Sequence, residues 1–150
     1  MIVRVDHISF AVNDLEKPVE HAKIFGGKYL FTQKVEKDGY QVAGVAIGEM
    51  VLTFMQPVTE DSWVRKYIDK NGEGLNHLGI EVENVEEYAN ELESKGIKVP
   101  VKLFDGDDGR KEILIGPKDG YGYVMQLIEW PEGSNTTPEQ RIARLTGYRT

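Results

Sequence analysis

One motif occurs twice in this chain, first as Val5-Asp6-His7-Ile8-Ser9-Phe10-Ala11-Val12 and again as Leu75-Asn76-His77-Leu78-Gly79-Ile80-Glu81-Val82. Each copy places a histidine inside an apolar, β-favouring run, five residues before a valine that leads into a polar, helix-starting segment. Self-similarity of this kind indicates that one supersecondary unit is used twice. We therefore expect His7 and His77 to occupy equivalent places in two related units.

The composition places the chain among ordinary globular proteins. Of its 150 residues, 40% are hydrophobic and 29% are charged. The net charge of −7, with no basic block, argues against nucleic acid and anionic membranes as partners. No run approaches the roughly 20 apolar residues that span a bilayer, and no signal-peptide pattern follows Met1, so a cytoplasmic location is expected. The absence of cysteine excludes thiolate metal sites and cysteine nucleophiles.

Each copy of the motif opens the same predicted series of elements. The first copy predicts a helix that starts after Asn13-Asp14 and ends at Gly26-Gly27, together with strands at 2–12, 28–36, 40–47 and 50–56. A short amphipathic helix, capped by Thr59 or Asp61, is expected to connect the two units. The second copy predicts a helix at 85–95 and strands at 75–82, 97–103, 111–115 and 121–130.

The predicted order is therefore βαβββ twice, an α+β fold in which two modules form a curved mixed sheet around a central cavity. Such a cavity is a natural place for a small-molecule ligand. We expect the first module at 1–57, a connector helix at 58–74, the second module at 75–131, and a C-terminal tail at 132–150. The tail is expected to include a short helix over 138–145.

Four further motifs extend this pattern beyond the two strands. They are Asp6-His7-Ile8 with Val12-Asn13-Asp14-Leu15-Glu16, Pro57-Val58-Thr59-Glu60-Asp61-Ser62, Gly72-Glu73-Gly74-Leu75-Asn76-His77, and Gly116-Pro117-Lys118-Asp119 with Gly122-Tyr123-Val124-Met125-Gln126-Leu127. On these motifs the chain resembles the vicinal oxygen chelate superfamily, which includes glyoxalase I, extradiol dioxygenases, fosfomycin and bleomycin resistance proteins and methylmalonyl-CoA epimerase. The likeness covers residues 2–131 and is closest to the epimerase branch.

The resemblance implies a divalent metal ion (Co, Ni, Mn, Zn or Fe) held inside the curved sheet by side chains from both modules. Carried over position by position, two ligands are His7 and His77. The third position, Glu or Gln in the family, is Thr53, and the fourth, normally Glu, is Gln126. A hydroxyl is a poor ligand, and an amide binds through its oxygen without neutralising the ion. The epimerases' other catalytic carboxylate falls on Lys37.

Each of these positions also has an ordinary structural interpretation. A single histidine in an apolar strand is more often a satisfied core residue, but its occurrence at matching places favours a ligand role for the pair. Gln126 is either a ligand or a buried amide that bonds its neighbours. Lys37 is either a base or anion contact in the cavity, or an exposed hairpin-tip residue. Thr53 is either simply a β-favouring residue that faces the cavity or a residue that reaches the metal ion through a water molecule.

Other charged residues complete the candidate site. Arg110 and Lys111 are the best basic groups to bind a carboxylate or phosphate on a ligand. The preceding loop holds Asp105, Asp107 and Asp108, which form either a solvated turn or a new source of a carboxylate. Glu129 lies three residues after Gln126, so strand alternation points it to the opposite face.

Taken together, these residues predict a metal-dependent isomerase, epimerase or lyase, similar to methylmalonyl-CoA epimerase. It would abstract a proton next to a carbonyl of a small acid or CoA thioester. The predicted metal ligands are His7, His77 and Gln126; Gln126 and Lys37 are the catalytic candidates, and Thr53, Arg110 and Lys111 the substrate contacts. The alternative is a non-catalytic, resistance-type binding protein of the same fold. An iron dioxygenase is less favoured, because Gln126 lacks the required carboxylate. A homodimer is expected.

Overall fold

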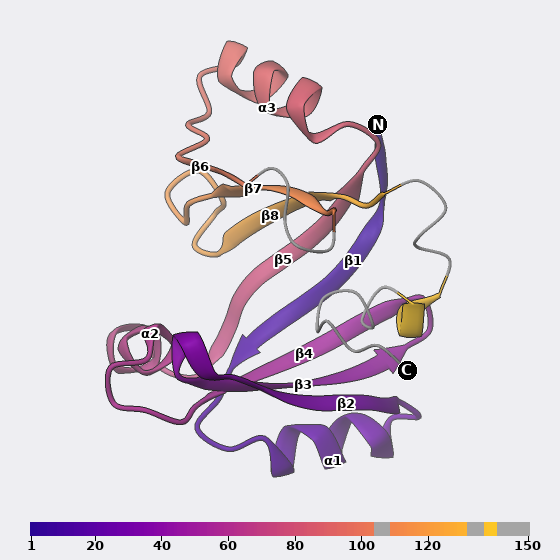
Figure 1. Ribbon diagram of the computed structural model, residues 1–150, viewed down its shortest axis with the longest axis vertical. Coiled ribbons are helices and arrows are strands. Elements are labelled where there is room, and N and C mark those ends of the chain that lie inside the picture. The colour runs from indigo at the N-terminus through magenta and orange to yellow at the C-terminus, as the bar shows by residue number, and fades with distance from the viewer. Residues whose placement is uncertain (104–108, 132–136, 141–150) are drawn as a thin grey trace. The chain divides into compact units, whose positions relative to one another are not determined.

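The computed structural model describes residues 1–103, 109–131 and 137–140. Its elements follow in the order β1 (Ile2–Ala11), α1 (Glu16–Ile24), β2 (Lys28–Val35), the 3-10 helix η1 (Glu36–Asp38), β3 (Tyr40–Ile47), β4 (Met50–Pro57), α2 (Trp63–Asn71), β5 (Gly74–Val82), α3 (Val85–Ser94), β6 (Val101–Leu103), β7 (Lys111–Ile115) and β8 (Val124–Glu129). The strands and major helices read βαβββ twice, with α2 between the two series (Figure 1). The repeated motif predicted this order.

The chain divides into two compact units, and the divisions fall inside β1 and β5. One unit comprises residues 8–76 and is called the 8–76 unit below. The other comprises Met1–His7 and the described residues from His77 onward, and is called the histidine unit because it holds both histidines of the repeated motif. The module boundaries expected from the sequence, after residues 57 and 74, remain predictions.

In the 8–76 unit the strand order is β2-β3-β4-β1, and β3 pairs antiparallel with both β2 and β4. Helix α1 lies along one face of these strands (Figure 1). Its apolar residues recur at helical spacing, so a single stripe is buried against the strands. The cluster consists of Leu15, Val19, Ala22, Ala43, Val45 and Phe54. Helix α2 packs Val64 and Ile68 against Ala11 and Met55 in a second cluster.

The cap of α2 differs from the prediction. The Ser62 hydroxyl accepts the hydrogen bond from Val64 N at 3.2 Å, and Ser62 is almost fully buried. Thr59 and Asp61 lie before the helix and do not cap it. The connector contains three cap-forming residue types, and the one next to the first apolar position of the helix takes the cap.

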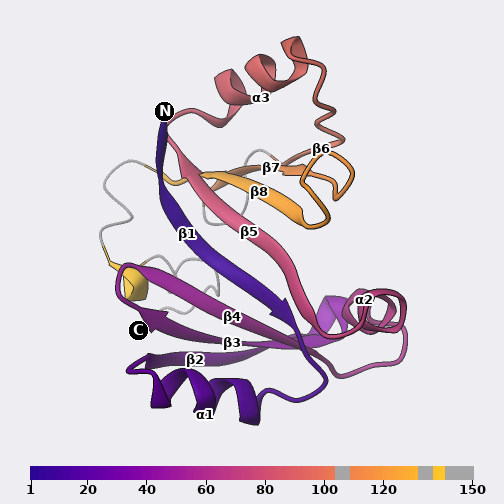
Figure 2. The ribbon, with the colours of Figure 1, turned by 180° about the vertical axis from the view of Figure 1, so that it is seen from behind.

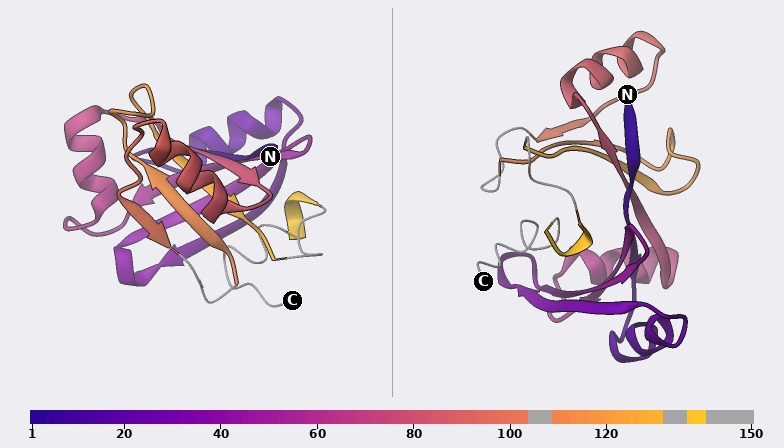
Figure 3. Two further views of the ribbon diagram at one scale, coloured as in Figure 1. Left: turned by 90° about the horizontal axis from the view of Figure 1, so that it is seen from above. Right: turned by 90° about the vertical axis from the view of Figure 1, so that its right-hand side faces the viewer.

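In the histidine unit the strand order is β1-β5-β8-β7-β6, so β5 lies between β1 and β8 (Figure 2). Strands β5 and β8 are parallel, whereas β7 is antiparallel to β8 and to β6. Helix α3 covers one face of these strands (Figure 3). Because side chains alternate along a strand, the residues that face α3 are Ile80, Val82, Ile113, Ile115 and Leu127. The side chains on the opposite face therefore include those of Glu112, Gln126 and His77.

Two strands are shorter than predicted. Strand β6 covers only Val101–Leu103, and β8 begins at Val124 rather than near residue 121. Strand β8 begins later because a turn precedes it: Tyr121 and Gly122 have positive φ angles of 57° and 98°, which are not compatible with a strand. The aspartates of the 104–108 segment lie outside the described residues, as does most of the predicted 138–145 helix.

Within the part of the chain that the structure describes, no helix is both long enough and apolar enough to cross a membrane.

Candidate metal site

The two histidines of the repeated motif meet in the histidine unit. His7 Nε2 and His77 Nε2 lie 3.0 Å apart, and the two imidazole rings are nearly perpendicular, with an interplanar angle of 89°. His7 projects from β1 and is 4% exposed, whereas His77 projects from β5 and keeps partial exposure. The sequence repeat therefore becomes a pair of convergent nitrogen atoms on neighbouring strands.

Asp6 contacts the other ring nitrogen of His7, Nδ1, and Trp130 in turn contacts Asp6. Asp6 Oδ2 lies 2.8 Å from His7 Nδ1, and Trp130 Nε1 donates to Asp6 Oδ1 at 3.3 Å. Since an ionised carboxylate only accepts hydrogen bonds, Nδ1 of His7 carries the proton and Nε2 presents its lone pair. Asp6 is 1% exposed and Trp130 is 6% exposed, so this arrangement is sheltered from water.

His77 resists protonation. Burial disfavours the charged imidazolium, and the nearby His7 adds a smaller unfavourable charge interaction; together they lower the pKa of His77 from 6.5 to about 3. At neutral pH its imidazole is therefore neutral, which is the form that binds metal ions. When both imidazoles are neutral and Nδ1 of His7 carries its proton, the proton between the two rings belongs to His77 Nε2, which donates to His7 Nε2.

Gly79 creates the space for the His7 ring. A Cβ atom built on Gly79 would lie 2.9 Å from His7 Nε2 and nearer still to Cε1 and Nδ1. The imidazole therefore lies over the backbone of β5, on the face to which His77, two residues earlier, also points. A residue with any side chain at position 79 would displace the ring.

Gln126 shares this face. It is the pairing partner of Gly79 across the parallel β5–β8 ladder, and laterally paired residues project to the same side. Gln126 Nε2 donates to Glu112 Oε2 at 2.6 Å. Gln126 Oε1 is buried and has no hydrogen-bond partner among the described residues. A buried carbonyl oxygen without a hydrogen-bond partner raises the free energy of the folded protein, so this atom is a candidate to bind a ligand.

The other predicted site residues in this unit divide between the two faces. Arg110 Nε lies 3.3 Å from Glu112 Oε2, which links it to Gln126 through that carboxylate. Lys111 Nζ instead lies 3.0 Å from Glu86 Oε1, on the α3 side. Glu129 also lies on that side, where its Oε2 accepts the hydrogen bond from Val85 N, as strand alternation predicted.

Thr53 and Lys37 belong to the 8–76 unit. Thr53 is buried in β4, opposite Gly44 in the β3–β4 ladder.

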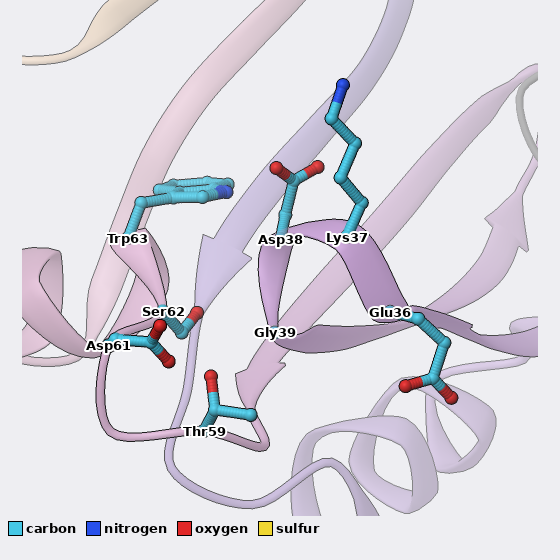
Figure 4. Close-up of a pocket in the computed structure, with 8 residues that line it drawn as sticks. All are labelled: Glu36, Lys37, Asp38, Gly39, Thr59, Asp61, Ser62 and Trp63. Atoms are coloured by element: carbon cyan, nitrogen blue, oxygen red, sulfur yellow. The ribbon is translucent and has the colours of Figure 1, made fainter.

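Lys37 is exposed in η1, where it lines a pocket of about 330 Å³. The other lining residues include Asp38, Gly39, Thr59, Asp61 and Trp63. Figure 4 shows the Lys37 and Asp38 side chains extending from η1 while Glu36 points away from them. A hydrogen bond from the Thr59 hydroxyl lowers the pKa of Asp61 in this pocket.

The residues of the histidine unit fit a divalent cation in part. When two nitrogen ligands each lie about 2.1 Å from one metal ion and the N–metal–N angle is about 90°, the two nitrogen atoms are about 3.0 Å apart. This distance matches the separation of His7 Nε2 and His77 Nε2. The orphan carbonyl oxygen of Gln126 supplies a third donor of suitable chemistry. Among the described residues, no three His, Asp or Glu side chains form a group that could hold a metal ion.

Sequence reasoning missed Glu112 and did not predict the contact of Trp130 with Asp6. Glu112 is 8% exposed and stands in the run Lys111-Glu112-Ile113-Leu114-Ile115, where alternation places it on the face opposite Ile113 and Ile115. The signal that could have identified Glu112 is a single acidic residue at a strand position that faces away from the apolar cluster. No sequence signal indicates the contact of Trp130 with Asp6, because Asp6 lies 124 residues away in the chain.

The chain is similar to several known proteins. The model of the Glyoxalase/Bleomycin resistance protein/Dioxygenase superfamily matches residues 6–113. Human mitochondrial methylmalonyl-CoA epimerase is 29% identical over 127 residues, which are 83% of this chain and 72% of the human protein.

Solved structures extend the likeness to the fold. A Streptomyces coelicolor methylmalonyl-CoA epimerase variant in complex with 2-nitronate-propionyl-CoA matches with a TM-score of 0.73 and 29% identity, over 87% of this chain and 99% of that one. A hypothetical protein from Bacillus halodurans matches with a TM-score of 0.76 and 25% identity, over 89% and 98% of the two chains. The α+β fold predicted from the repeated motif is thereby confirmed.

Proposed function

Because the chain belongs to the Glyoxalase/Bleomycin resistance protein/Dioxygenase superfamily, we propose that it is a metal-dependent isomerase of the epimerase type. The reaction would begin with abstraction of a proton next to the carbonyl of a small acid or its CoA thioester, and return of a proton to the other face of the resulting enolate would complete the epimerisation. The observation that carries the proposal is the convergence of His7 Nε2 and His77 Nε2, 3.0 Å apart. The likeness to methylmalonyl-CoA epimerases from human and Streptomyces coelicolor supports the choice of substrate class.

His7, His77 and Gln126 are the proposed ligands of the metal ion. His7 is prepared for this role because Asp6 holds its Nδ1–H and leaves the Nε2 lone pair exposed to the site. Burial keeps His77 neutral, and Gln126 contributes a carbonyl oxygen with no other partner among the described residues. A bound divalent cation would polarise the substrate carbonyl and stabilise the enolate oxygen.

Proton transfer requires a separate base. Lys37 is the proposed candidate from the 8–76 unit, either as the base or as a contact for an anionic group of the substrate. Thr53, Arg110 and Lys111 are proposed as further substrate contacts. A Lys37→Gln variant tests the assignment, with exposed Lys34→Gln on the neighbouring strand β2 as the matched control. Loss of proton exchange in the first variant alone is the expected result.

The decisive experiment has two parts. Co²⁺ is titrated into metal-free protein by calorimetry, and the exchange of the C2 proton of methylmalonyl-CoA in D₂O is then followed by NMR. We expect Co²⁺ binding that His7→Ala abolishes, and exchange that depends on the added metal. Absence of Co²⁺ binding would reject the metal-dependent mechanism. Metal binding without exchange would reject the epimerase assignment and leave the metal site standing.

One observation favours a second candidate, a binding protein that does not catalyse a reaction. The buried carboxylates of the histidine unit already have partners: Asp6 contacts His7 and Trp130, Glu81 lies 2.8 Å from Arg4, and Glu112 contacts Gln126 and Arg110. A carboxylate whose oxygens are occupied by such contacts is less accessible to a substrate proton than one that is open to the site. This candidate predicts that a CoA thioester binds with unchanged affinity to the His7→Ala variant and undergoes no exchange.

A small-molecule substrate, a cytoplasmic location and a homodimer complete the proposal. Val3 and Val5, which alternation places on one face of β1, have exposed apolar side chains, and an exposed apolar surface is typical of one that pairs with a second copy. Sedimentation velocity tests the dimer. A monomer at all protein concentrations would contradict it.

A further inference from the structure

Glu112 determines which end of the Gln126 amide is available to a ligand. The side-chain amide of glutamine has a donor end and an acceptor end, and its orientation has to be inferred from its hydrogen bonds. Here Gln126 faces a carboxylate oxygen of Glu112 at 2.6 Å. A carboxylate accepts hydrogen bonds and does not donate them, so the NH₂ group must be the end that faces Glu112. Oε1 is therefore turned away from Glu112.

The orientation leaves Oε1 buried without a hydrogen-bond partner among the described residues. Register places this amide on the same face as His77 and the His7 ring, since Gln126 pairs with Gly79, over which that ring lies. The contact with Glu112 thus gives the face that holds two imidazole nitrogens a third donor atom, a carbonyl oxygen, in place of an NH₂ group that would repel a cation.

Glu112 is itself held in place. It is 8% exposed, and Arg110 Nε lies 3.3 Å from the same Oε2 atom that accepts from Gln126. The Arg110 guanidinium lies 5.8 Å from the centre of the Trp130 ring, and Trp130 donates to Asp6, which orients His7. A single chain of contacts therefore connects the groups that orient Gln126 with those that orient His7.

We propose that Glu112, held by Arg110, is a positioning residue that presents the Gln126 carbonyl oxygen to a divalent cation bound by His7 and His77. The inference rests on the metal-binding part of the proposed function. It explains how a neutral amide would serve as a ligand here: a negative group on the neighbouring strand orients the amide.

Replacement of Glu112 by Gln tests the inference. Glutamine has nearly the same shape but allows the Gln126 amide to rotate, because it offers both a donor and an acceptor. Loss of an outer-shell partner typically lowers metal affinity 10- to 100-fold, so we expect Co²⁺ to bind at least about tenfold more weakly to Glu112→Gln. The matched control is Glu129→Gln, a Glu to Gln change on the opposite face of β8, and its Co²⁺ affinity should equal that of the unaltered protein.

A second variant exchanges the two groups. The double variant Glu112→Gln with Gln126→Glu restores a donor–acceptor pair in the reverse sense and places a carboxylate oxygen at the ligand position. Because a charged oxygen neutralises the cation, the double variant should bind Co²⁺ at least as tightly as the unaltered protein. Because a carboxylate at position 126 presents an oxygen in either orientation, the double variant tests whether position 126 supplies the ligand, whereas Glu112→Gln alone tests the positioning role of Glu112.

Two readouts accompany the affinities. The visible absorption of bound Co²⁺ reports a change of ligand, and the side-chain NH₂ resonances of Gln126 in metal-free protein report its hydrogen bond to Glu112. We expect both to shift in Glu112→Gln and neither in Glu129→Gln. If Co²⁺ binds with full affinity to Glu112→Gln, the positioning role is wrong while the metal site stands. If the unaltered protein binds no Co²⁺, the inference and the metal-dependent function are both wrong.

Discussion

His7 Nε2 and His77 Nε2 lie 3.0 Å apart on neighbouring strands, although 70 residues separate them in the chain. The contact joins two copies of one sequence motif, and each histidine depends on a different neighbour. Asp6 sets the proton position on His7, whereas burial keeps His77 neutral. The pair is therefore sensitive to changes in packing, in acidity and in the groups behind it.

Gly79→Ala should disturb the pair through packing. The new methyl group would lie within 2.9 Å of His7 Nε2 and nearer to two other ring atoms, so the imidazole has to move. Overpacking of this kind costs about 1–3 kcal/mol of unfolding free energy, and we expect Co²⁺ affinity to fall about tenfold or more. Urea denaturation and calorimetry measure the two effects.

Gly116→Ala is the matched control for that change. A Cβ atom at Gly116 meets no atom within 4 Å, and its backbone φ is not in the left-handed region. Its unfolding free energy should change by less than about 0.5 kcal/mol. Equal effects of the two alanine variants would contradict the packing argument.

Acid should destabilise the metal-free protein through His77. The unfolded imidazole takes up a proton below about pH 6.5, while the folded one remains neutral until about pH 3. A histidine whose folded pKa is lowered contributes stability above pH 6.5 that is lost as the pH falls. The loss amounts to at most about 1.4 kcal/mol per pH unit for one group. Urea denaturation between pH 7.5 and 5 should therefore show a flatter profile for His77→Gln.

Exposed His21 on α1 provides the control for acidity. His21→Gln should reproduce the pH profile of the unaltered protein, because this ring is not buried. If His77→Gln and His21→Gln gave the same profile, burial of His77 would not be the source of the acid sensitivity.

Trp130→Phe should loosen the orientation of His7. Phenylalanine fills most of the same space but cannot donate to Asp6 Oδ1. The loss of this buried hydrogen bond is expected to cost about 1–2 kcal/mol of unfolding free energy. The ¹⁵N chemical shifts of the His7 ring nitrogens report whether Nδ1 keeps its proton. Unchanged stability and unchanged ring shifts would show that Asp6 does not need Trp130.

Glu129→Ala should affect stability without affecting the metal. Glu129 Oε2 accepts from Val85 N at the start of α3, where a negative charge also interacts favourably with the helix dipole. We expect a loss of about 1 kcal/mol in unfolding free energy and no change in Co²⁺ affinity. A fall in affinity would mean that the two faces of β8 are not independent.

The sequence alone predicted most of the fold and half of the candidate site. The repeated histidine strand gave the βαβββ order and identified His7 and His77, because hydrophobic alternation and the length of a strand are local properties of the chain. The same alternation assigned Glu129 to the face opposite Gln126. The boundaries of β6 and β8 and the cap of α2 were less well predicted, because turns and competing cap residues depend on a few local contacts.

The tertiary structure alone decided how the site is supported. Glu112 meets Gln126 across two antiparallel strands, and Trp130 meets Asp6 from the far end of the chain. Neither contact leaves a periodic signal, because a hydrogen bond between distant residues depends on strand register and on side-chain rotamers. The sequence thus determined which two histidines would be paired, whereas only the folded chain determined which groups fix the ring of His7 and the amide of Gln126.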